Sequence, residues 1–79
     1  MVRVLLDPSF EKTFSKIKDN VLKEKIIKQI EKIREDPEIG KPMKYSRKGT
    51  RELYISPFRL AYLYLKAVDV DKVIILDFY

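Results

Sequence analysis

The chain has 79 residues, 46% of them hydrophobic and 37% charged, a composition that fits one folded domain and is too apolar for a disordered tail. Cysteine and histidine are both absent, which excludes disulfides, thiolate or imidazole metal sites and catalysis by either side chain. We therefore expect no metal and no other cofactor. No apolar run approaches the roughly 20 residues of a membrane span, so we expect a cytoplasmic protein without a membrane partner.

The first part of the chain reads as a strand followed by a helix. Residues 2–6 are aliphatic and β-branched, which favours a strand, and the pair Asp7-Pro8 is typical of a helix start. Four apolar side chains then recur at helical spacing and should face a sheet: Phe10, Phe14, Ile17 and Val21.

A second helix is expected from Asn20, because Asp19-Asn20 can break the first helix and cap the next. It should end before Pro37, since the residue preceding a proline is pushed out of helical geometry. Its apolar face carries Leu22, Ile26, Ile30 and Ile33. Only a tight turn joins the two helices, so we expect an antiparallel hairpin.

The rest of the chain predicts strands at residues 43–46, 50–56, 58–66 and 73–79. The strand at 58–66 is apolar on both sides and should lie in the centre of the sheet. The order βααββββ predicts a single domain over residues 1–79 with a two-layer α+β fold. In this fold, an N-terminal strand and an antiparallel helical hairpin pack on a mainly antiparallel sheet of four to five strands.

The positive charge is concentrated in residues 40–66, which hold seven Lys or Arg against one acidic residue, a net charge of +6. The remainder of the chain sums to −1, and the whole chain to +5. Tyrosines are interleaved with these cations, as on surfaces that neutralise phosphates and stack on unpaired bases. We expect a surface for RNA or another acidic partner. The alternative is a merely solvated face, because +5 is a normal charge for a small soluble domain.

Arg59 is the most informative single residue, because its neighbours along the predicted strand are apolar. Its guanidinium must reach a carboxylate, a phosphate or the open surface. Glu52 and Asp77 are the candidate carboxylates.

Three phrases of the sequence resemble the toxins of the RelE/ParE superfamily. They are GKPMK at residues 40–44, RELYISPFRLAY at residues 51–62 and VIIL at residues 73–76. Members of that superfamily typically have G-K-P-L-K, then R-E-L-R-V-G-x-Y-R-V-x-Y, then a final aliphatic strand. The helical hairpin ahead of the sheet also belongs to that fold, so the resemblance spans the whole chain.

The resemblance implies the toxin of a type II toxin–antitoxin system, which a cognate antitoxin wraps and neutralises in a hetero-oligomer. RelE-like members cleave mRNA in the ribosomal A site without a metal and inhibit translation, whereas ParE-like members poison DNA gyrase. We expect the endoribonuclease, with mRNA and the ribosome as partners. The alternatives are a gyrase poison and a catalytically inactive toxin fold that binds its antitoxin.

Position by position, the resemblance implies a catalytic set of Arg59, as a phosphate clamp, with Arg51 and Lys44 as supporting cations. The residues expected to contact RNA are Lys41, Arg47, Lys48 and Tyr54, and Tyr79 is a further candidate. The sequence departs from the pattern at Tyr54, where many relatives have arginine, at Phe58, where tyrosine is usual, and near Glu52, where the best-studied nucleases use lysine. The last catalytic residues of the family follow the final strand, so we expect residues after Tyr79 to be missing.

Overall fold

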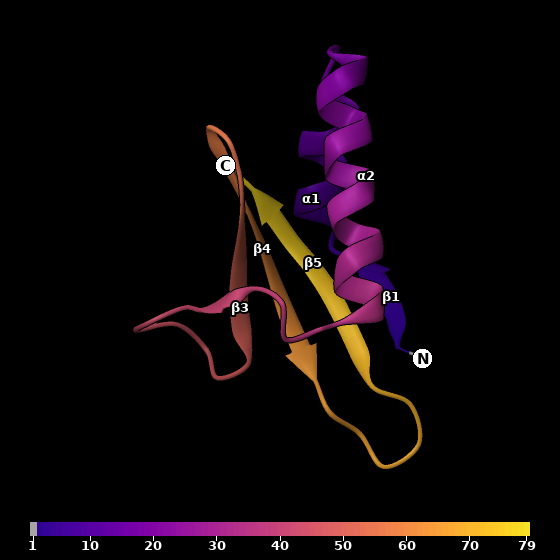
Figure 1. Cartoon of the computed structure of the whole chain (residues 1–79), viewed down its shortest axis with the longest axis vertical. Coiled ribbons are helices and arrows are strands. Elements are labelled where there is room, and N and C mark those ends of the chain that lie inside the picture. The colour runs from indigo at the N-terminus through magenta and orange to yellow at the C-terminus, as the bar shows by residue number, and fades with distance from the viewer. Residues whose placement is uncertain (1) are drawn as a thin grey trace.

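The computed structural model describes residues 2–79 as five strands and two helices in the predicted order (Figure 1). The elements are β1 (Arg3–Leu6), α1 (Pro8–Ser15), α2 (Asn20–Glu35), β2 (Lys41–Pro42), β3 (Thr50–Ile55), β4 (Phe58–Leu65) and β5 (Lys72–Phe78).

The five strands form one sheet in the order β1-β5-β4-β3-β2. β1 runs parallel to β5, and the other neighbouring pairs are antiparallel. β4 lies in the centre, as its apolar character on both sides predicts: Leu60 and Tyr62 are buried on one face, Ala61 and Leu63 on the other. The predicted two-layer α+β fold is confirmed.

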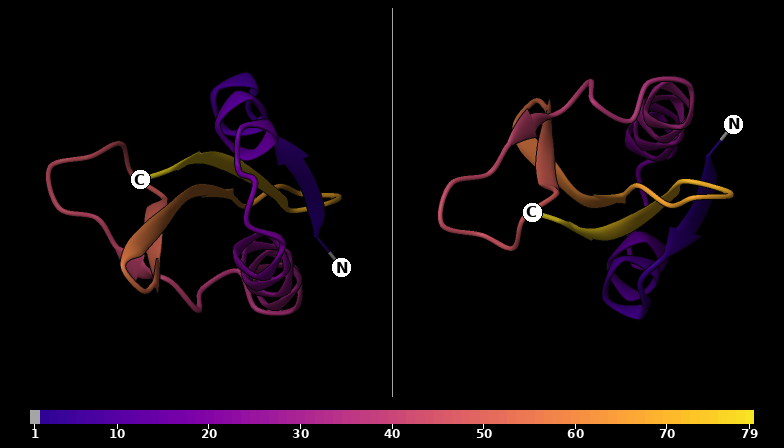
Figure 2. Two further views of the ribbon diagram at one scale, coloured as in Figure 1. Left: turned by 90° about the horizontal axis from the view of Figure 1, so that it is seen from above. Right: turned by 90° about the horizontal axis from the view of Figure 1, so that it is seen from below.

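Both helices begin at the predicted caps. The Asp7 carboxylate accepts the backbone N–H of Ser9 at 2.9 Å, and the Asp19 carboxylate accepts that of Val21 at 2.9 Å. The helices run in opposite directions (Figure 1), and the views along the long axis show them on the side of the molecule away from the projecting loop of residues 43–49 (Figure 2).

Side chains from both helices and from one face of the sheet form a single core. Its buried members are Phe10, Ile26, Ile33, Ile55, Leu60, Tyr62, Val73, Ile75 and Phe78. The prediction for Val21 is wrong: α1 ends at Ser15, so Val21 falls in the first turn of α2 with 62% of its surface exposed. The chain turns after Ser15, which breaks the helical spacing on which that prediction depended.

The predicted strand at residues 43–46 is also wrong. Pairing with β3 occurs two residues earlier, at Lys41–Pro42. Tyr45 has φ 60° and Gly49 has φ 92°, left-handed conformations that an extended strand excludes. The chain between them forms turns, and the N–H of Met43 donates to the carbonyl of Thr50 at 3.0 Å to close the loop.

Two side chains from the sheet hold the loop between α2 and β2. The Tyr62 hydroxyl donates to the carbonyl of Pro37 at 2.7 Å and accepts the N–H of Gly40 at 2.9 Å. The Arg51 guanidinium donates to the carbonyls of Gly40 at 2.7 Å and Glu38 at 3.1 Å. We call these bonds the loop clamp.

Gly40 is required at this place because the backbone lies against the tyrosine ring. A Cβ atom there would meet the Tyr62 hydroxyl oxygen at 2.6 Å and the carbonyl of Glu52 at 2.9 Å. Any side chain at residue 40 would therefore push the loop off the sheet.

Replacing Tyr62 by phenylalanine tests the loop clamp. Tyr62→Phe leaves the Gly40 N–H and the Pro37 carbonyl without their partner, so we expect the free energy of unfolding to fall by about 1–3 kcal/mol. Urea denaturation measures the change. The matched control is Tyr54→Phe, since that exposed hydroxyl bonds only to Ser56 at 3.5 Å, and it should leave the midpoint nearly unchanged.

The wild type and Tyr62→Phe should also differ in how their stability changes at alkaline pH. Burial raises the pKa of the Tyr62 phenol, an effect that the Gly40 hydrogen bond and the charge of Arg51 oppose. The protonated phenol thus stabilises the fold below its unfolded pKa, and that contribution is lost as the pH rises through the folded pKa. The stability advantage of the wild type over Tyr62→Phe should shrink above about pH 10; an advantage that grows there would contradict this account.

Candidate nucleic-acid interface

The sheet face opposite to the core displays Arg59 between two tyrosines. Tyr54 on β3 is the direct register partner of Arg59 on β4. On the other side, the backbone N–H groups of Arg59 and Tyr79 each donate to the other residue's carbonyl, at 2.6 and 2.9 Å. Residues paired in this way across antiparallel strands lie on the same face, so Tyr54, Arg59 and Tyr79 form a row across the sheet.

A second row lies beside the first. Lys41 on β2 is the register partner of Glu52 on β3, which in turn is paired with Ala61 on β4. Glu52 is therefore the diagonal neighbour of Arg59 on the same face.

The two rows and the chain after β2 border a hollow of about 440 Å³. It is lined by Lys41, Pro42, Met43, Lys44, Glu52, Arg59 and Tyr79. Tyr54 lines a smaller hollow directly beside it, together with Lys41, Glu52 and Arg59. The structure thus brings together five of the eight predicted site residues: Lys41, Lys44, Tyr54, Arg59 and Tyr79. We call them, with Glu52, the Arg59 face.

Glu52 sits among these cations and contacts two members of the Arg59 face. One carboxylate oxygen lies 3.6 Å from Arg59 Nη1, and the other accepts a hydrogen bond from the Tyr79 hydroxyl at 3.4 Å. The Glu52 side chain is 23% exposed and that of Arg59 is 55% exposed. The prediction of Glu52 as a partner of Arg59 is confirmed, whereas the Asp77 carboxylate accepts the backbone N–H of Phe78 instead.

The electrostatic balance on the Arg59 face is positive. Among residues 2–79, the hollow of about 440 Å³ at Arg59 is lined by three cationic side chains, those of Lys41, Lys44 and Arg59, and by one carboxylate, that of Glu52. Partial burial, followed by the charge of Glu52 and the hydrogen bond to it, raises the pKa of the Tyr79 phenol. That phenol is therefore protonated at neutral pH and acts as a hydrogen-bond donor.

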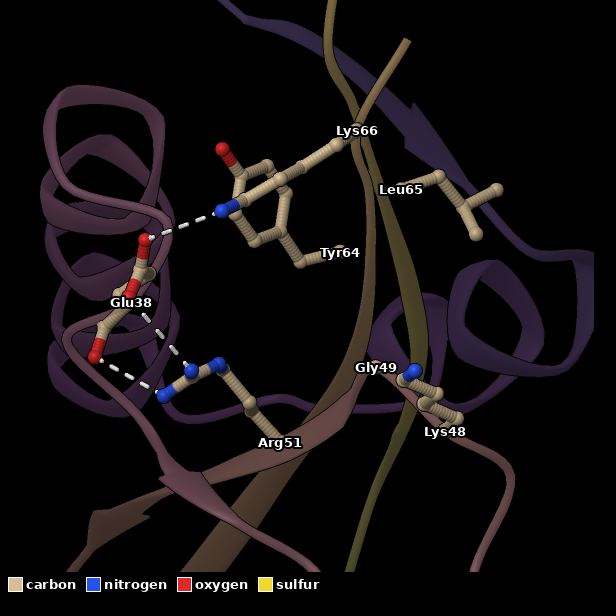
Figure 3. Close-up of a pocket in the computed structure, with 7 residues that line it drawn as sticks. All are labelled: Glu38, Lys48, Gly49, Arg51, Tyr64, Leu65 and Lys66. Atoms are coloured by element: carbon tan, nitrogen blue, oxygen red, sulfur yellow. Dashed lines mark hydrogen bonds and ion pairs between the residues drawn. The ribbon is translucent and has the colours of Figure 1, made fainter.

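Arg51 lies on the other face, because alternation along β3 puts it opposite Tyr62. Besides its two bonds in the loop clamp, its guanidinium lies 3.8 Å from the Glu38 carboxylate, which Lys66 approaches at 3.8 Å from the other side (Figure 3). These three residues line a hollow of about 480 Å³ on the Arg51 side of the sheet, together with Lys48 and Tyr64. The structure does not bring Arg51 to Arg59, and Nη1 of Arg51 donates to the protein's own backbone.

Arg47 and Lys48 belong to the projecting loop of residues 43–49 (Figures 1 and 2). Both are exposed, and neither is among the residues lining the hollow at Arg59. Tyr45 lies in the same loop with its ring fully in solvent. The loop therefore divides its cations: Lys44 lines the hollow at Arg59, Lys48 lines the hollow at Arg51, and Arg47 lines neither.

Glu52 was named from the sequence as a candidate partner of Arg59 but was not counted among the site residues. The signal was present: alternation puts Glu52 and Tyr54 on one face, and the two residues Ser56 and Pro57 between the strands pair Tyr54 with Arg59. Glu52 must then lie diagonally from Arg59. The pairing of Tyr79 with Arg59 could not be predicted from the sequence in the same way. It depends on a β-bulge at Leu76, which has no partner between the pairs Ala61–Asp77 and Tyr62–Ile75.

Two negative findings apply to the described part of the chain. None of the helices within residues 2–79 is long and apolar enough to cross a membrane. In the same residues, no group of three or more Asp or Glu side chains gathers closely enough to hold a metal ion.

Comparison with solved structures shows that the fold is shared with a chain of a toxin–antitoxin complex. A chain of the intact Escherichia coli RelBE toxin–antitoxin complex superposes with a TM-score of 0.79 at 16% identity, over 99% of this chain and 94% of that one. The conserved hypothetical protein HP0894 from Helicobacter pylori is 30% identical, with a TM-score of 0.60 over 99% of this chain and 92% of that one. None of the curated proteins compared with the chain matches it.

The sequence itself matches a family over nearly its whole length. The family described as the ParE toxin of the type II toxin–antitoxin system parDE matches residues 4–78. The fold and this match define a toxin of the RelE/ParE superfamily, and the chain belongs to the ParE toxin family.

The two arginines provide a matched test of the division between the sheet faces. Arg59→Ala should weaken binding of a short single-stranded RNA while leaving the unfolding free energy nearly unchanged. Arg51→Ala removes the same charge but breaks two of the four bonds of the loop clamp. It should therefore lower the unfolding free energy by about 1.5–3 kcal/mol and reduce RNA affinity less than Arg59→Ala does. Fluorescence anisotropy with labelled RNA and urea denaturation measure the two effects. Equal losses of RNA affinity in the two variants would show that the faces do not divide the roles.

Proposed function

We propose that the chain is an RNA-cleaving toxin, a metal-independent endoribonuclease that cuts mRNA at the ribosome and so inhibits translation. The observation that carries the proposal is the Arg59 face, where a half-exposed guanidinium between two tyrosines borders a hollow that Lys41 and Lys44 also line. A hollow of about 440 Å³ falls within the usual size of ligand sites, about 300–1,000 Å³.

The residues of the Arg59 face fit the charge that develops during RNA cleavage. When a 2′-hydroxyl attacks the adjacent phosphorus, negative charge accumulates on the non-bridging oxygens. A planar guanidinium such as that of Arg59 can donate two parallel hydrogen bonds to such oxygens, and Lys41 and Lys44 add positive charge. The backbone pairing of β3, β4 and Tyr79 fixes the Cα atom of Arg59, and the Glu52 carboxylate 3.6 Å from Nη1 holds the guanidinium on this face before the substrate arrives.

The tyrosines supply contacts that do not depend on charge. Tyr54 and Tyr79 are both exposed on either side of Arg59, and the rings of exposed tyrosines can stack on unpaired bases. A phosphate at Arg59 would thus have an aromatic ring on each side for the neighbouring nucleotides. This arrangement favours single-stranded RNA over a duplex, whose bases are already stacked.

We propose a cognate antitoxin as the protein partner, binding as a hetero-oligomer and covering the positive face. The family match and the shared fold with a protein solved as a toxin–antitoxin complex support this partner. A short acidic or amphipathic protein encoded in the adjacent reading frame would be the expected antitoxin, since its charge would complement the +6 of residues 40–66.

The family match favours a second candidate function. Because the matching family is named for ParE, and the resemblance implies gyrase poisoning for ParE-like members, the Arg59 face could instead bind DNA gyrase. The two functions differ in what happens to mRNA in cells that express the protein.

Primer extension on mRNA from expressing cells distinguishes the two candidates. We expect codon-dependent cuts with the wild type and a reduction of about 10²–10³-fold with Arg59→Ala, the usual effect of removing one preorganised electrostatic group. Lys28→Ala, which removes a cation from the exposed side of α2, is the charge-matched control and should cut like the wild type. Intact mRNA accompanied by gyrase-dependent DNA damage would establish the second function and refute the first.

A further inference from the structure

The Arg59 face contains one group that a purely phosphate-binding surface does not need. Glu52 carries a negative charge among three cations that line the same hollow, where it weakens the attraction for phosphate. The pair that it forms with Arg59 is partly exposed and has a spacing of 3.6 Å, so its contribution to stability is small. Its position is better explained by the chemistry of the proposed cleavage.

We propose that Glu52 is the general base of the cleavage reaction and that Tyr79 is its proton-donating partner. This inference rests on the proposed RNA cleavage. The geometry points to it because the two oxygens of the carboxylate face different groups: one lies beside Arg59 Nη1 at 3.6 Å and the other beside the Tyr79 hydroxyl at 3.4 Å. A phosphate held by Arg59 is thereby placed next to both a proton acceptor and a proton donor.

The proton transfers balance over one cleavage step. The Glu52 carboxylate takes the proton of the 2′-hydroxyl, the 2′ oxygen forms a bond to phosphorus, and the bond from phosphorus to the 5′ oxygen breaks. The departing 5′ oxygen takes the phenolic proton of Tyr79. The products are a 2′,3′-cyclic phosphate and a 5′-hydroxyl. Tyr79 then regains a proton from Glu52 through the hydrogen bond between them, which restores both groups.

The neighbours of Glu52 suit this role. Arg59 holds the carboxylate beside the phosphate, and Lys41, the register partner of Glu52, can offset the negative charge that the phosphate brings. The Glu52 side chain is only 23% exposed and contacts both Arg59 and Tyr79, which restricts its rotamers more than those of a fully exposed acid. The protonated state of the Tyr79 phenol at neutral pH leaves it able to donate.

The decisive experiment compares cleavage with binding in the same variant. Glu52→Gln should lower the rate of mRNA cleavage on programmed ribosomes by about 10²–10⁴-fold, the usual contribution of a general base. Its affinity for an RNA blocked by 2′-O-methyl groups should be unchanged or tighter, because a negative charge has been removed from the face. Glu52→Asp, which keeps a carboxylate on a shorter stem, should retain part of the rate. Glu24→Gln on the exposed side of α2 is the matched control.

A modified substrate tests the role of Tyr79. When sulfur replaces the bridging 5′ oxygen, the leaving group departs without a proton. Tyr79→Phe should therefore cleave the ordinary RNA slowly and the sulfur-containing RNA at nearly the wild-type rate. Glu52→Gln should be slow on both substrates, since the 2′-hydroxyl must still lose its proton.

Two results would overturn the proposal, and they differ from each other. If the wild type cleaves but Glu52→Gln cleaves as fast or faster, Glu52 only weakens phosphate binding and the base lies elsewhere, while the proposed function stands. If the wild type leaves ribosome-bound mRNA intact under all conditions in which it arrests growth, the proposed function fails and the assignment of Glu52 fails with it.

Discussion

The loop clamp, formed by Tyr62 and Arg51 on residues 37–40, is the interaction on which the Arg59 face depends. β2 has only two residues, and one of them, Pro42, has no N–H to donate to a neighbouring strand. Such a strand cannot hold its own register. Four hydrogen bonds to the loop immediately before it, and the lack of space for a side chain at Gly40, determine where the chain enters the sheet.

The register that results places Lys41 opposite Glu52, and this pairing forms one side of the hollow at Arg59. Because successive side chains of β3 point to opposite faces of the sheet, the neighbours Arg51 and Glu52 have different roles. Arg51 points toward the core side and fastens the loop, while Glu52 points to the opposite face and meets Arg59. A positive charge used for folding and a positive charge available for a ligand are thus separated by the thickness of one sheet.

The sequence predicted the order of the elements, the helix caps and the central position of β4, because these depend on local periodicity and capping. It did not predict that Arg51 and Arg59 lie on opposite faces of the sheet. Both were considered as cations of one segment, without regard to the face on which each lies once β3 and β4 pair. It also misplaced β2. The left-handed conformation of Tyr45 depends on how the loop closes against Thr50, since nothing in the local sequence favours a positive φ at a tyrosine.

The central claim is that the face carrying Arg59, and not the face carrying Arg51, binds RNA. Titration of ¹⁵N-labelled protein with a short single-stranded RNA protected by 2′-O-methyl groups tests this claim most directly, because each amide signal reports on the surroundings of its own residue. We expect the largest changes in amide chemical shift at Lys41, Glu52, Arg59 and Tyr79. Changes concentrated at Glu38, Tyr64 and Lys66, with the Arg59 face unaffected, would contradict the claim.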